Sequence, residues 1–462
     1  MNRYQPSHRF PELPVNNGNP RRAAFRILSR VERDNAYADI LIDRQLTVGD
    51  LSPRDRALLT ELVFGVLRRR GTLDYLIERC SSRSPAKLER SVLMLLRLGL
   101  YQMFFLERIP VSAAVNETVK LAREFAPRAS GFVNAVLRRF GRERDAIRWP
   151  DRGADPAGFL AARYSHPRWL VEEWLRMLGA EEAESLAAAM SAAPSLTVRV
   201  NTLRTSREAL LAALAAEGVE ARQTVWSPVG VHILSTVRPS SLAAFREGLL
   251  TVQDESSQLA SLLLAPLPGE DLLDLCAAPG GKATHLAQLM ENRGSILACD
   301  RDERKLRRIA DNAARLGTEI VATRVLDASL PLDLPRERFH RILVDAPCTG
   351  LGVIRRNPET KWRLAPSDPS RLSQLQRAIL RNAAPHLSAG GVLLYSTCST
   401  SREENEAVID DFISEHEDFV VENLHELFPG YASLFTERGM FRSWPHRHGM
   451  DGFFAARLKK RC

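Results

Sequence analysis

Long hydrophobic runs are missing from this sequence. No apolar stretch approaches the roughly 20 residues that a membrane-spanning helix needs, and the first residues, MNRYQPSHRF, lack the apolar core of an export signal. Cysteine is scarce as well, because the six cysteines form neither a CxxC pair nor the Cys/His spacing of a zinc site. These absences predict a cytoplasmic protein with free thiols, no membrane partner and no bound metal.

Lysine is nearly absent from the first third of the chain. Residues 1–150 contain 27 Lys and Arg against 16 Asp and Glu, and only two of these cations are lysines. The whole chain carries a formal net charge of +8, so the remainder is slightly acidic. Because arginine contacts phosphates and stacks on bases, this distribution predicts a nucleic-acid-binding module at the N-terminal end. The alternative is a basic surface that only keeps the domain soluble.

Helical periodicity dominates residues 20–147, whereas residues 1–19 are rich in Pro and Asn and are expected to form a mobile tail. Apolar residues recur at helical spacing, as at Ala24, Ile27, Leu28 and Val31. Ser52 is expected to cap a helix that begins with Pro53. The stretch KLERSVLMLLRLGLYQMFFL is apolar nearly all round, which is typical of a buried central helix. Residues 20–147 are therefore predicted to form an all-α domain.

Two further domains are expected after a linker at residues 148–158. Residues 159–250 mix helices with short strands at SLTVRVNTLR and GVHIL, which predicts a small α+β domain that presents a sheet to RNA. In residues 251–462 strands alternate with helices of about 10–15 residues, which predicts a doubly wound, mostly parallel sheet. In such sheets the ligand lies outside the carboxyl ends of the strands.

The strands and helices of this last domain follow a regular order. Five strands are expected to end in DLLDLCA, SILACD, EIVATRVLD, RILVDAPC and GGVLLYSTC. Helices are expected from Lys282 and over residues 302–316, 368–387 and 403–416, followed by a last strand pair near FVVENL and GFFAARLKK.

A glycine-containing loop, CAAPGGK, follows the first of these strands. Gly280 and Gly281 allow a ligand to approach the backbone before a helix N-terminus, although a plain tight turn is the alternative. The loop is not a Walker A motif, because Cys276 stands in place of the first Gly and Ala283 in place of the Ser/Thr. It does not match GxGxxG either.

Acidic residues end the next two strands. Asp300 follows the second strand, where a carboxylate binds a ribose diol; its alternative role is to cap the helix at 302–316. Asp327 follows the third strand, at a position suited to an adenine amino group. A ribose-binding acid and a glycine loop alone would also allow a nicotinamide cofactor.

Two thiols end the last two strands, Cys348 in DAPC and Cys398 in STC, and Asp345 precedes the first of them. A disulfide is one explanation, and structural burial of one cysteine is another. The third explanation is covalent catalysis on an electron-poor ring. Glu403 and Glu404, shortly after the second thiol, are expected to favour the N-terminus of the next helix.

The chain resembles two known families. The helix order and the stretch IPVSAAVNETVKLAREFAPRASGFVNAVLRRF are similar to the NusB-type RNA-binding fold. The motifs DLCAAPGGKATHLA, DAPCTGLG, STCSTSREEN and HGMDGFFAARL resemble the RNA 5-methylcytosine methyltransferases, and with the NusB-like part they resemble the Sun/Fmu type that acts on small-subunit ribosomal RNA. This resemblance implies a Rossmann-like class I methyltransferase domain that binds S-adenosylmethionine. The implied cofactor-binding residues are Cys276, Ala277, Ala278, Pro279, Gly280, Gly281, Lys282, Asp300, Asp327 and Asp345.

The chemistry of cytosine gives two thiols two tasks. C5 of cytosine is a poor nucleophile until a thiolate adds to C6, and afterwards a base must remove the C5 proton so that the thiol can leave. The residues alone leave open which cysteine does which. The resemblance assigns attack to Cys398 and release to Cys348, and it places Asp345 near the cytosine N3/N4 edge and the cofactor.

The resemblance also implies the substrate. It points to 16S ribosomal RNA bound by a monomer, with the target base swung out of its stack. The same chemistry on tRNA or another RNA is an alternative, as is a non-catalytic RNA-binding factor of ribosome assembly. The paired cysteines argue against the non-catalytic alternative, since a binding protein does not need both.

Overall fold

The computed structural model describes residues 18–462, and its internal contacts divide the chain into two units. Unit 1 comprises the described residues up to Ser191 together with the segment Asn357–Arg363. Unit 2 comprises Ala192–Arg356 and Leu364–Cys462, and each unit is described by itself. Nearly all of the predicted mobile tail lies outside the described residues.

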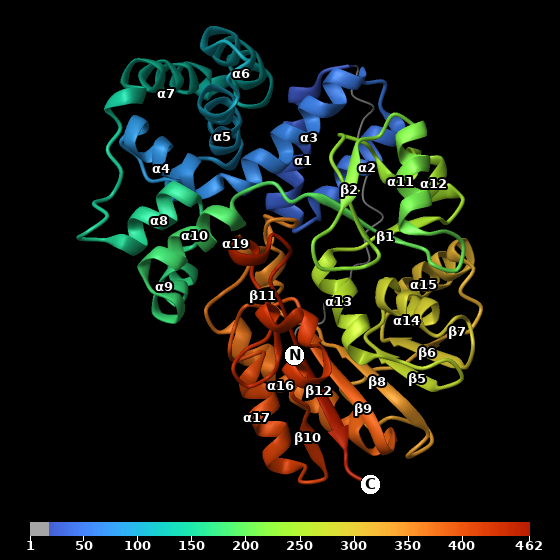
Figure 1. Ribbon diagram of the computed structural model, residues 1–462. Coiled ribbons are helices and arrows are strands. Elements are labelled where there is room, and N and C mark those ends of the chain that lie inside the picture. The colour runs from blue at the N-terminus through green and yellow to red at the C-terminus, as the bar shows by residue number, and fades with distance from the viewer. Residues whose placement is uncertain (1–17) are drawn as a thin grey trace. The chain divides into compact units, whose positions relative to one another are not determined.

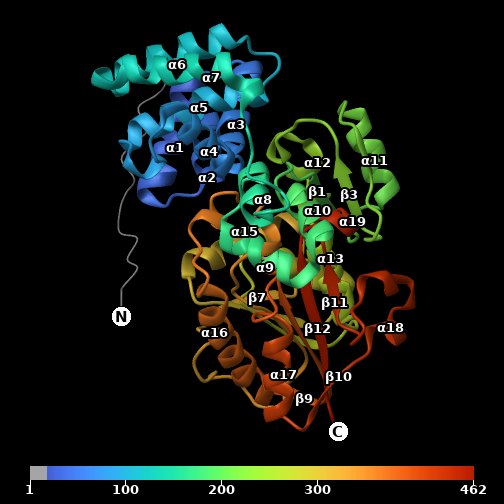
Figure 2. The same cartoon turned by 90° about the vertical axis from the view of Figure 1, so that its left-hand side faces the viewer.

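Seven helices of unit 1 form the predicted all-α domain. They are α1 (Pro20–Asp34), α2 (Ala38–Val48), α3 (Pro53–Arg68), α4 (Arg70–Ser81), α5 (Arg90–Phe105), α6 (Val111–Phe125) and α7 (Ser130–Glu143). Helix α5 contacts α1, α3, α4, α6 and α7, which confirms its predicted central place, and Figure 2 shows α6 and α7 side by side. The predicted Ser52 cap is confirmed, because its side chain accepts a hydrogen bond from the backbone N–H of Asp55. None of the helices within residues 18–462 is both long and apolar enough to cross a membrane.

Three more helices and one distant segment complete unit 1. The helices are α8 (Pro156–Tyr164), α9 (Arg168–Leu178) and α10 (Ala180–Met190). The segment Asn357–Arg363 contains a single 3-10 turn, and its Lys361 is fully buried. Lys361 Nζ donates to the backbone oxygen of Arg68 (3.2 Å), and burial lowers the pKa of this amine well below its usual value. A lysine amine is thus withdrawn from water and hydrogen-bonded to unit 1, which attaches this segment.

Unit 2 begins with a small antiparallel sheet. Its strands are β1 (Leu196–Val200), β2 (Ala221–Gln223), β3 (Gly230–Ile233) and β4 (Leu250–Val252), in the order β2-β3-β1-β4, accompanied by α11 (Arg207–Ala216) and α12 (Ala243–Arg246). The two strands expected in SLTVRVNTLR and GVHIL are confirmed as β1 and β3. Four strands with two helices confirm the predicted small α+β fold.

The large sheet of unit 2 has the predicted doubly wound topology. Its parallel strands are β5 (Asp271–Leu275), β6 (Ser295–Asp300), β7 (Val321–Val325), β8 (Phe339–Asp345) and β9 (Leu387–Thr397). Antiparallel strands β10 (Phe419–Val421), β11 (Phe441–Ser443) and β12 (Phe453–Lys460) extend the β9 edge. In the order β10-β12-β9-β8-β5-β6-β7, strand β5 lies in the interior. From β5 the chain builds outward through β6 and β7 on one side, and then returns to add β8 and β9 on the other side. This is the switch point beside which such sheets bind ligands.

Helices cover both faces of this sheet. One face is covered by α13 (Glu255–Leu264), α14 (Gly281–Leu289) and α15 (Glu303–Leu316), and the other by α16 (Asp368–Ala383) and α17 (Glu406–Glu415), as Figure 1 shows. The short helices α18 (Leu424–Leu427) and α19 (Pro445–His448) lie in the connections near β11. Strands β5, β6, β8 and β9 are largely apolar because a separate hydrophobic core fills each face of the sheet, whereas the edge strand β7 is mostly exposed. The helix expected from residue 403 begins three residues later, and this difference is explained by the site below.

The crossing of α3 and α5 provides a test of the unit 1 core. A Cβ atom on Gly65 would lie 2.0 Å from Cζ of the Tyr101 ring, so we expect Gly65→Ala to lower the free energy of unfolding by about 1–3 kcal/mol. Gly131→Ala in α7 is the matched control, since a Cβ there meets nothing within 4 Å and alanine gains up to about 1 kcal/mol in a helix. Chemical denaturation checks both. Equal effects of the two substitutions would contradict this packing.

Candidate active site

The carboxyl ends of five parallel strands meet at one edge of the large sheet. The loop Cys276–Gly281 follows β5, and Asp300 ends β6. Asp327 comes two residues after β7, Asp345 ends β8, and Cys398 follows β9 directly. Because β5 to β9 run parallel, the sheet brings all of the predicted site residues to this edge.

The glycine loop makes a sharp turn between β5 and α14. Cys276 and Gly280 have positive φ angles of 65° and 97°, and the Gly280 N–H donates to the Ala277 oxygen (2.7 Å). A Cβ atom on Gly280 would lie 3.1 Å from the backbone of Ile309, so only glycine fits without displacing α15. Burial raises the pKa of the Cys276 thiol, which therefore stays protonated. Cys276 shapes the backbone rather than presenting a thiolate.

An unpredicted residue, Arg199 of β1, holds this loop from behind. Its guanidinium is fully buried and donates to the backbone oxygen of Gly281 (2.6 Å) and to side chains of Thr284 (3.0 Å) and Gln288 (3.1 Å). Burial, with a smaller contribution from Arg315, lowers its pKa to about 9. The small sheet thereby fixes the start of α14.

The two acids at β6 and β7 have different environments. Asp300 accepts a hydrogen bond from the backbone N–H of Asp302 (3.0 Å) and is 8% exposed. The cap of α15 is Asp302, which accepts from the Arg304 N–H (3.0 Å), so the capping alternative for Asp300 is wrong. Asp327 is exposed, and the hydrogen bonds that it accepts from Ser329 lower its pKa. Both side chains present acceptor oxygens at the strand ends.

Asp345 is held on both of its carboxylate oxygens. Lys282 Nζ lies 2.6 Å from Oδ2, and the Ser396 hydroxyl donates to Oδ1 (2.9 Å). The fully buried Asp274 of β5 was missed by sequence reasoning; no described residue donates a hydrogen bond to either of its oxygens. Burial, and then the charge of Asp345, raises the pKa of Asp274 well above its usual value, so it is a neutral carboxyl. An acid inside an otherwise apolar buried strand was the available signal.

The two cysteines at β8 and β9 face each other. Their Sγ atoms are 3.3 Å apart, which is longer than a covalent S–S bond of about 2.05 Å, and both thiols are free. The disulfide alternative is therefore wrong for this structure. The hydrogen bond with Cys398, followed by burial, raises the pKa of the Cys348 thiol. The raised pKa favours the protonated form of Cys348.

A single buried carboxylate, Glu404, joins the two cysteine loops. It accepts hydrogen bonds from the Thr349 N–H (2.8 Å), from the Thr349 and Ser399 hydroxyls, and from Gln376 Nε2 (3.1 Å). Thr349 and Ser399 directly follow Cys348 and Cys398 in the sequence. Glu404 therefore positions both thiols, and α17 begins only at Glu406 because residues 402–405 turn this side chain inward. Sequence reasoning expected Glu404 only to favour the start of the next helix, and it missed these hydrogen bonds to both cysteine loops.

The same loops approach each other through glycine backbone. The Gly352 N–H donates to the Cys398 oxygen (2.9 Å), and the Gly452 N–H donates to the Gly352 oxygen (3.0 Å). A Cβ atom on Gly352 would lie 1.9 Å from the Gly452 oxygen. The glycines of GLG and MDG thus allow the chain after Cys348 to pack against the chain after Cys398.

Comparison with known proteins gives matches along almost the whole chain. Residues 261–459 match the model of the 16S rRNA methyltransferase RsmB/F family, residues 18–142 that of the NusB family, and residues 166–238 that of the RsmF/B-like ferredoxin-like domain. A curated relative, the probable ribosomal RNA small subunit methyltransferase B of Bacillus subtilis, is 40% identical over 95% of this chain and 98% of its own length.

Solved structures show the same similarity. The crystal structure of PH0851 covers 96% of this chain and 100% of its own, with 29% identity and a TM-score of 0.77. NSun6 from Pyrococcus horikoshii with the S-adenosylmethionine analogue SFG covers 64% of this chain and 98% of its own, with 26% identity and a TM-score of 0.56.

The role of Glu404 can be tested without an activity assay. Glu404→Gln replaces an acceptor oxygen by a donor amide facing four hydrogen-bond donors, and we expect it to lower the free energy of unfolding by about 2–4 kcal/mol. We also expect faster alkylation of Cys348 and Cys398 by N-ethylmaleimide, because their loops loosen. The exposed neighbour Glu403→Gln is the control and should stay within about 0.5 kcal/mol of the wild type. Unchanged stability and alkylation in Glu404→Gln would refute this role.

Proposed function

The chain belongs to the 16S rRNA methyltransferase RsmB/F family, and from this we propose that it methylates C5 of a cytosine in 16S ribosomal RNA through a covalent Cys398–C6 adduct. It is an S-adenosylmethionine-dependent methyltransferase. The observation that carries the proposal is the pair of free thiols, 3.3 Å apart, at the ends of the neighbouring strands β8 and β9.

The residues at the strand ends fit S-adenosylmethionine. The loop from Cys276 to Lys282 turns tightly in front of α14 and leaves no Cβ at Gly280, so a ligand can lie against its backbone. We assign Asp300 to the ribose hydroxyls and Asp327 to the adenine amino group, because both side chains offer acceptor oxygens. When bound, the cofactor supplies an electrophilic methyl group.

Cys398 is the proposed nucleophile. Its thiolate adds to C6, which makes C5 electron-rich enough to accept the methyl group. The hydrogen bond between the two sulfurs is the largest cause of the raised pKa of Cys348, and this favours Cys348 as the partner that keeps its proton. In the starting pair, Cys348 keeps its proton and Cys398 reacts.

Cys348 is the proposed base. Once the Cys398 sulfur is bonded to C6, it is no longer a thiolate that can hydrogen-bond Cys348. The largest cause of the raised pKa of Cys348 is then removed, and this pKa falls. The Cys348 thiol then releases its proton to water, and the resulting thiolate takes the C5 proton. The electron pair of the C5–H bond restores the C5–C6 double bond, and the C6–S bond breaks to return the Cys398 thiolate. C5 and C6 are adjacent ring atoms, which suits two sulfurs 3.3 Å apart.

Asp345 is proposed to orient the base or the cofactor. Lys282 and Ser396 hold its two oxygens, so the carboxylate has little freedom to turn. It ends β8 three residues before Cys348, and an acceptor there suits the cytosine N4 amino group. The neutral Asp274 below adds no second charge at this position.

The proposed partner is 16S ribosomal RNA, bound by a cytoplasmic monomer. The arginine-rich helices of unit 1 would contact the phosphate backbone, so binding should weaken as salt rises. The curated relatives are small-subunit ribosomal RNA methyltransferases by name, which favours this RNA over tRNA.

The affinity for S-adenosylmethionine should depend on Asp300 but not on its neighbour Asp302. We expect Asp300→Asn to raise the Kd for S-adenosylmethionine about 10- to 100-fold, because a hydrogen bond between a charged acceptor and a hydroxyl is worth about 1.5–3 kcal/mol. Asp302→Asn retains the cap of α15 and should leave the Kd unchanged. Isothermal titration calorimetry measures both. Equal weakening by the two substitutions would show that the helix start, and not the Asp300 carboxylate, matters.

The division of labour between the cysteines is tested by trapping the adduct. With unmodified 16S RNA and S-adenosylmethionine, we expect Cys348→Ala to accumulate an RNA–protein adduct that survives denaturing gel electrophoresis, because the release step is blocked. Cys398→Ala should form no adduct and lose at least about 100-fold in methyl transfer. Cys299→Ala, a buried thiol elsewhere in the sheet, is the control and should form no stable adduct. An adduct in Cys398→Ala alone would show that the roles are reversed.

A further inference from the structure

A pocket of about 580 Å³ lies within unit 1 and has no part in the methyl-transfer site described above. Its walls come from the connection between α1 and α2, from the start of α4 and from the segment Asn357–Arg363. The residues that give it chemical character are Glu32, Tyr37, Arg70, Glu359, Trp362 and Arg363. The volume falls in the range of about 300–1,000 Å³ that is usual for pockets that bind small ligands.

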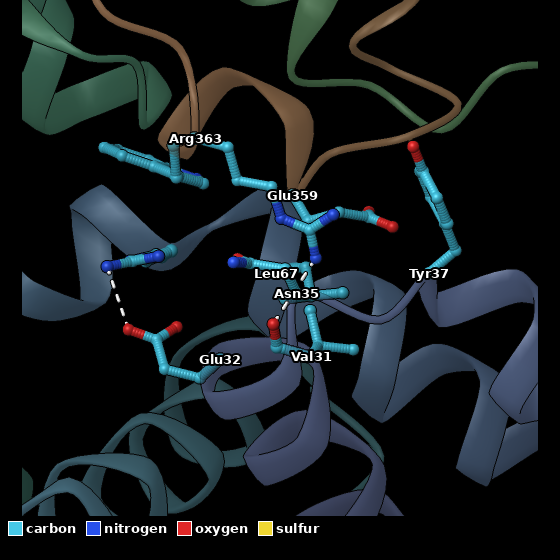
Figure 3. A pocket seen from close by; sticks show the side chains of 9 residues that line it. Val31, Glu32, Asn35, Tyr37, Leu67, Glu359 and Arg363 are labelled. Carbon is cyan, nitrogen blue, oxygen red and sulfur yellow. Dashed lines mark hydrogen bonds and ion pairs between the residues drawn. The ribbon is translucent and has the colours of Figure 1, made fainter. Parts of the chain in front are cut away.

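The aromatic rings of the pocket are each paired with a guanidinium. Arg363 lies 5.6 Å from the centre of the Tyr37 ring and donates to the Ala36 oxygen (2.7 Å). Arg70 lies 5.3 Å from the centre of the Trp362 ring and pairs with Glu32 (3.1 Å). Figure 3 shows Tyr37 at one side of the pocket, Glu32 at the other, and Arg363 between them. These fixed planar groups offer faces on which a flat aromatic ring can stack.

Two buried polar atoms of the lining residues have no hydrogen-bond partner among residues 18–462. Glu359 is 3% exposed; its Oε1 accepts from the Ala38 N–H (3.1 Å), whereas its Oε2 is unpaired. The indole N–H of Trp362 is also unpaired. A buried group left unpaired costs about 1–3 kcal/mol, so a ligand that brings a donor and an acceptor relieves this cost after small side-chain movements.

The charges of the pocket select against an anion. Glu32 and Glu359 balance Arg70 and Arg363, so a phosphate group here would lie against two carboxylates. A nucleobase is uncharged and flat, and its edge carries both donors and acceptors. Carboxylates accept hydrogen bonds from exocyclic amino groups, which uracil lacks.

We propose that this pocket binds an unpaired RNA base that carries an exocyclic amino group, stacked on Tyr37 and read by Glu359. The inference rests on the proposed function only in taking RNA as the ligand. The segment Asn357–Arg363 follows Cys348 closely in the sequence, so a base held here touches the continuation of the catalytic loop. The pocket thus gives unit 1 a means of recognising single-stranded bases in addition to its basic charge.

The test measures binding of the full chain to fluorescein-labelled single-stranded RNA decamers of cytidine, adenosine or uridine by fluorescence anisotropy. Tyr37 is 54% exposed, so its substitution should leave the fold intact. We expect Tyr37→Ala to weaken binding of the cytidine and adenosine decamers about tenfold, the usual worth of one stacked base. Tyr37→Phe should restore it, and wild-type binding of the uridine decamer should already be the weakest.

Ile40→Ala is the matched control, because Ile40 is 53% exposed on α2 and does not line the pocket. Three results would each overturn the proposal: unchanged binding in Tyr37→Ala, equal weakening in Ile40→Ala, or no measurable binding of the decamers by the wild type. Unchanged binding in Tyr37→Ala would indicate that the pocket binds a protein partner instead. Methyl transfer by the wild type is measured in parallel. If it is absent while binding depends on Tyr37, the proposed function fails and the pocket stands. If transfer is normal while binding does not depend on Tyr37, the proposed function stands and the pocket fails.

Discussion

The reactive centre of this protein depends on one buried carboxylate. Glu404 receives hydrogen bonds from the residues that directly follow Cys348 and Cys398, and the two sulfurs come to lie 3.3 Å apart. A carboxylate taken out of water is costly unless all of its acceptor positions are used, and here four donors use them. Neither loop can shift alone without breaking this set. The chemistry proposed for the thiols therefore rests on a group that takes no part in bond making.

The parallel sheet brings the glycine loop, the acids and the thiols of the site to one edge. Its strand order places the glycine loop at the centre, the two acceptor acids on one side and the two thiols on the other. Asp345 stands between these halves, held by Lys282 from the glycine loop and by Ser396 from the thiol side. One carboxylate thus links the two halves of the proposed site. The small sheet contributes from behind through Arg199, whose buried guanidinium fixes the first turn of α14.

Local patterns in the sequence predict those parts of the fold that depend on neighbouring residues. The five strand ends, the Ser52 cap and the buried helix α5 all follow from periodicity and capping chemistry. The paired cysteines stand out because each ends a strand. Glu404 could not be recognised in this way, since its acidic neighbours are typical of a helix start and two of its partners, Gln376 and Thr349, lie 28 and 55 residues earlier. Arg199 and the attachment of Asn357–Arg363 to unit 1 escape prediction for the same reason, because each depends on contacts between distant parts of the chain.

The central claim is that this arrangement methylates C5 of cytosine. The most direct measurement incubates the protein with unmodified 16S RNA and S-adenosylmethionine labelled in its methyl group, digests the RNA to nucleosides and identifies the labelled product by chromatography and mass spectrometry. The account predicts that the label is recovered as 5-methylcytidine. Label in any other nucleoside, or on N4 or the ribose of cytidine, would contradict it.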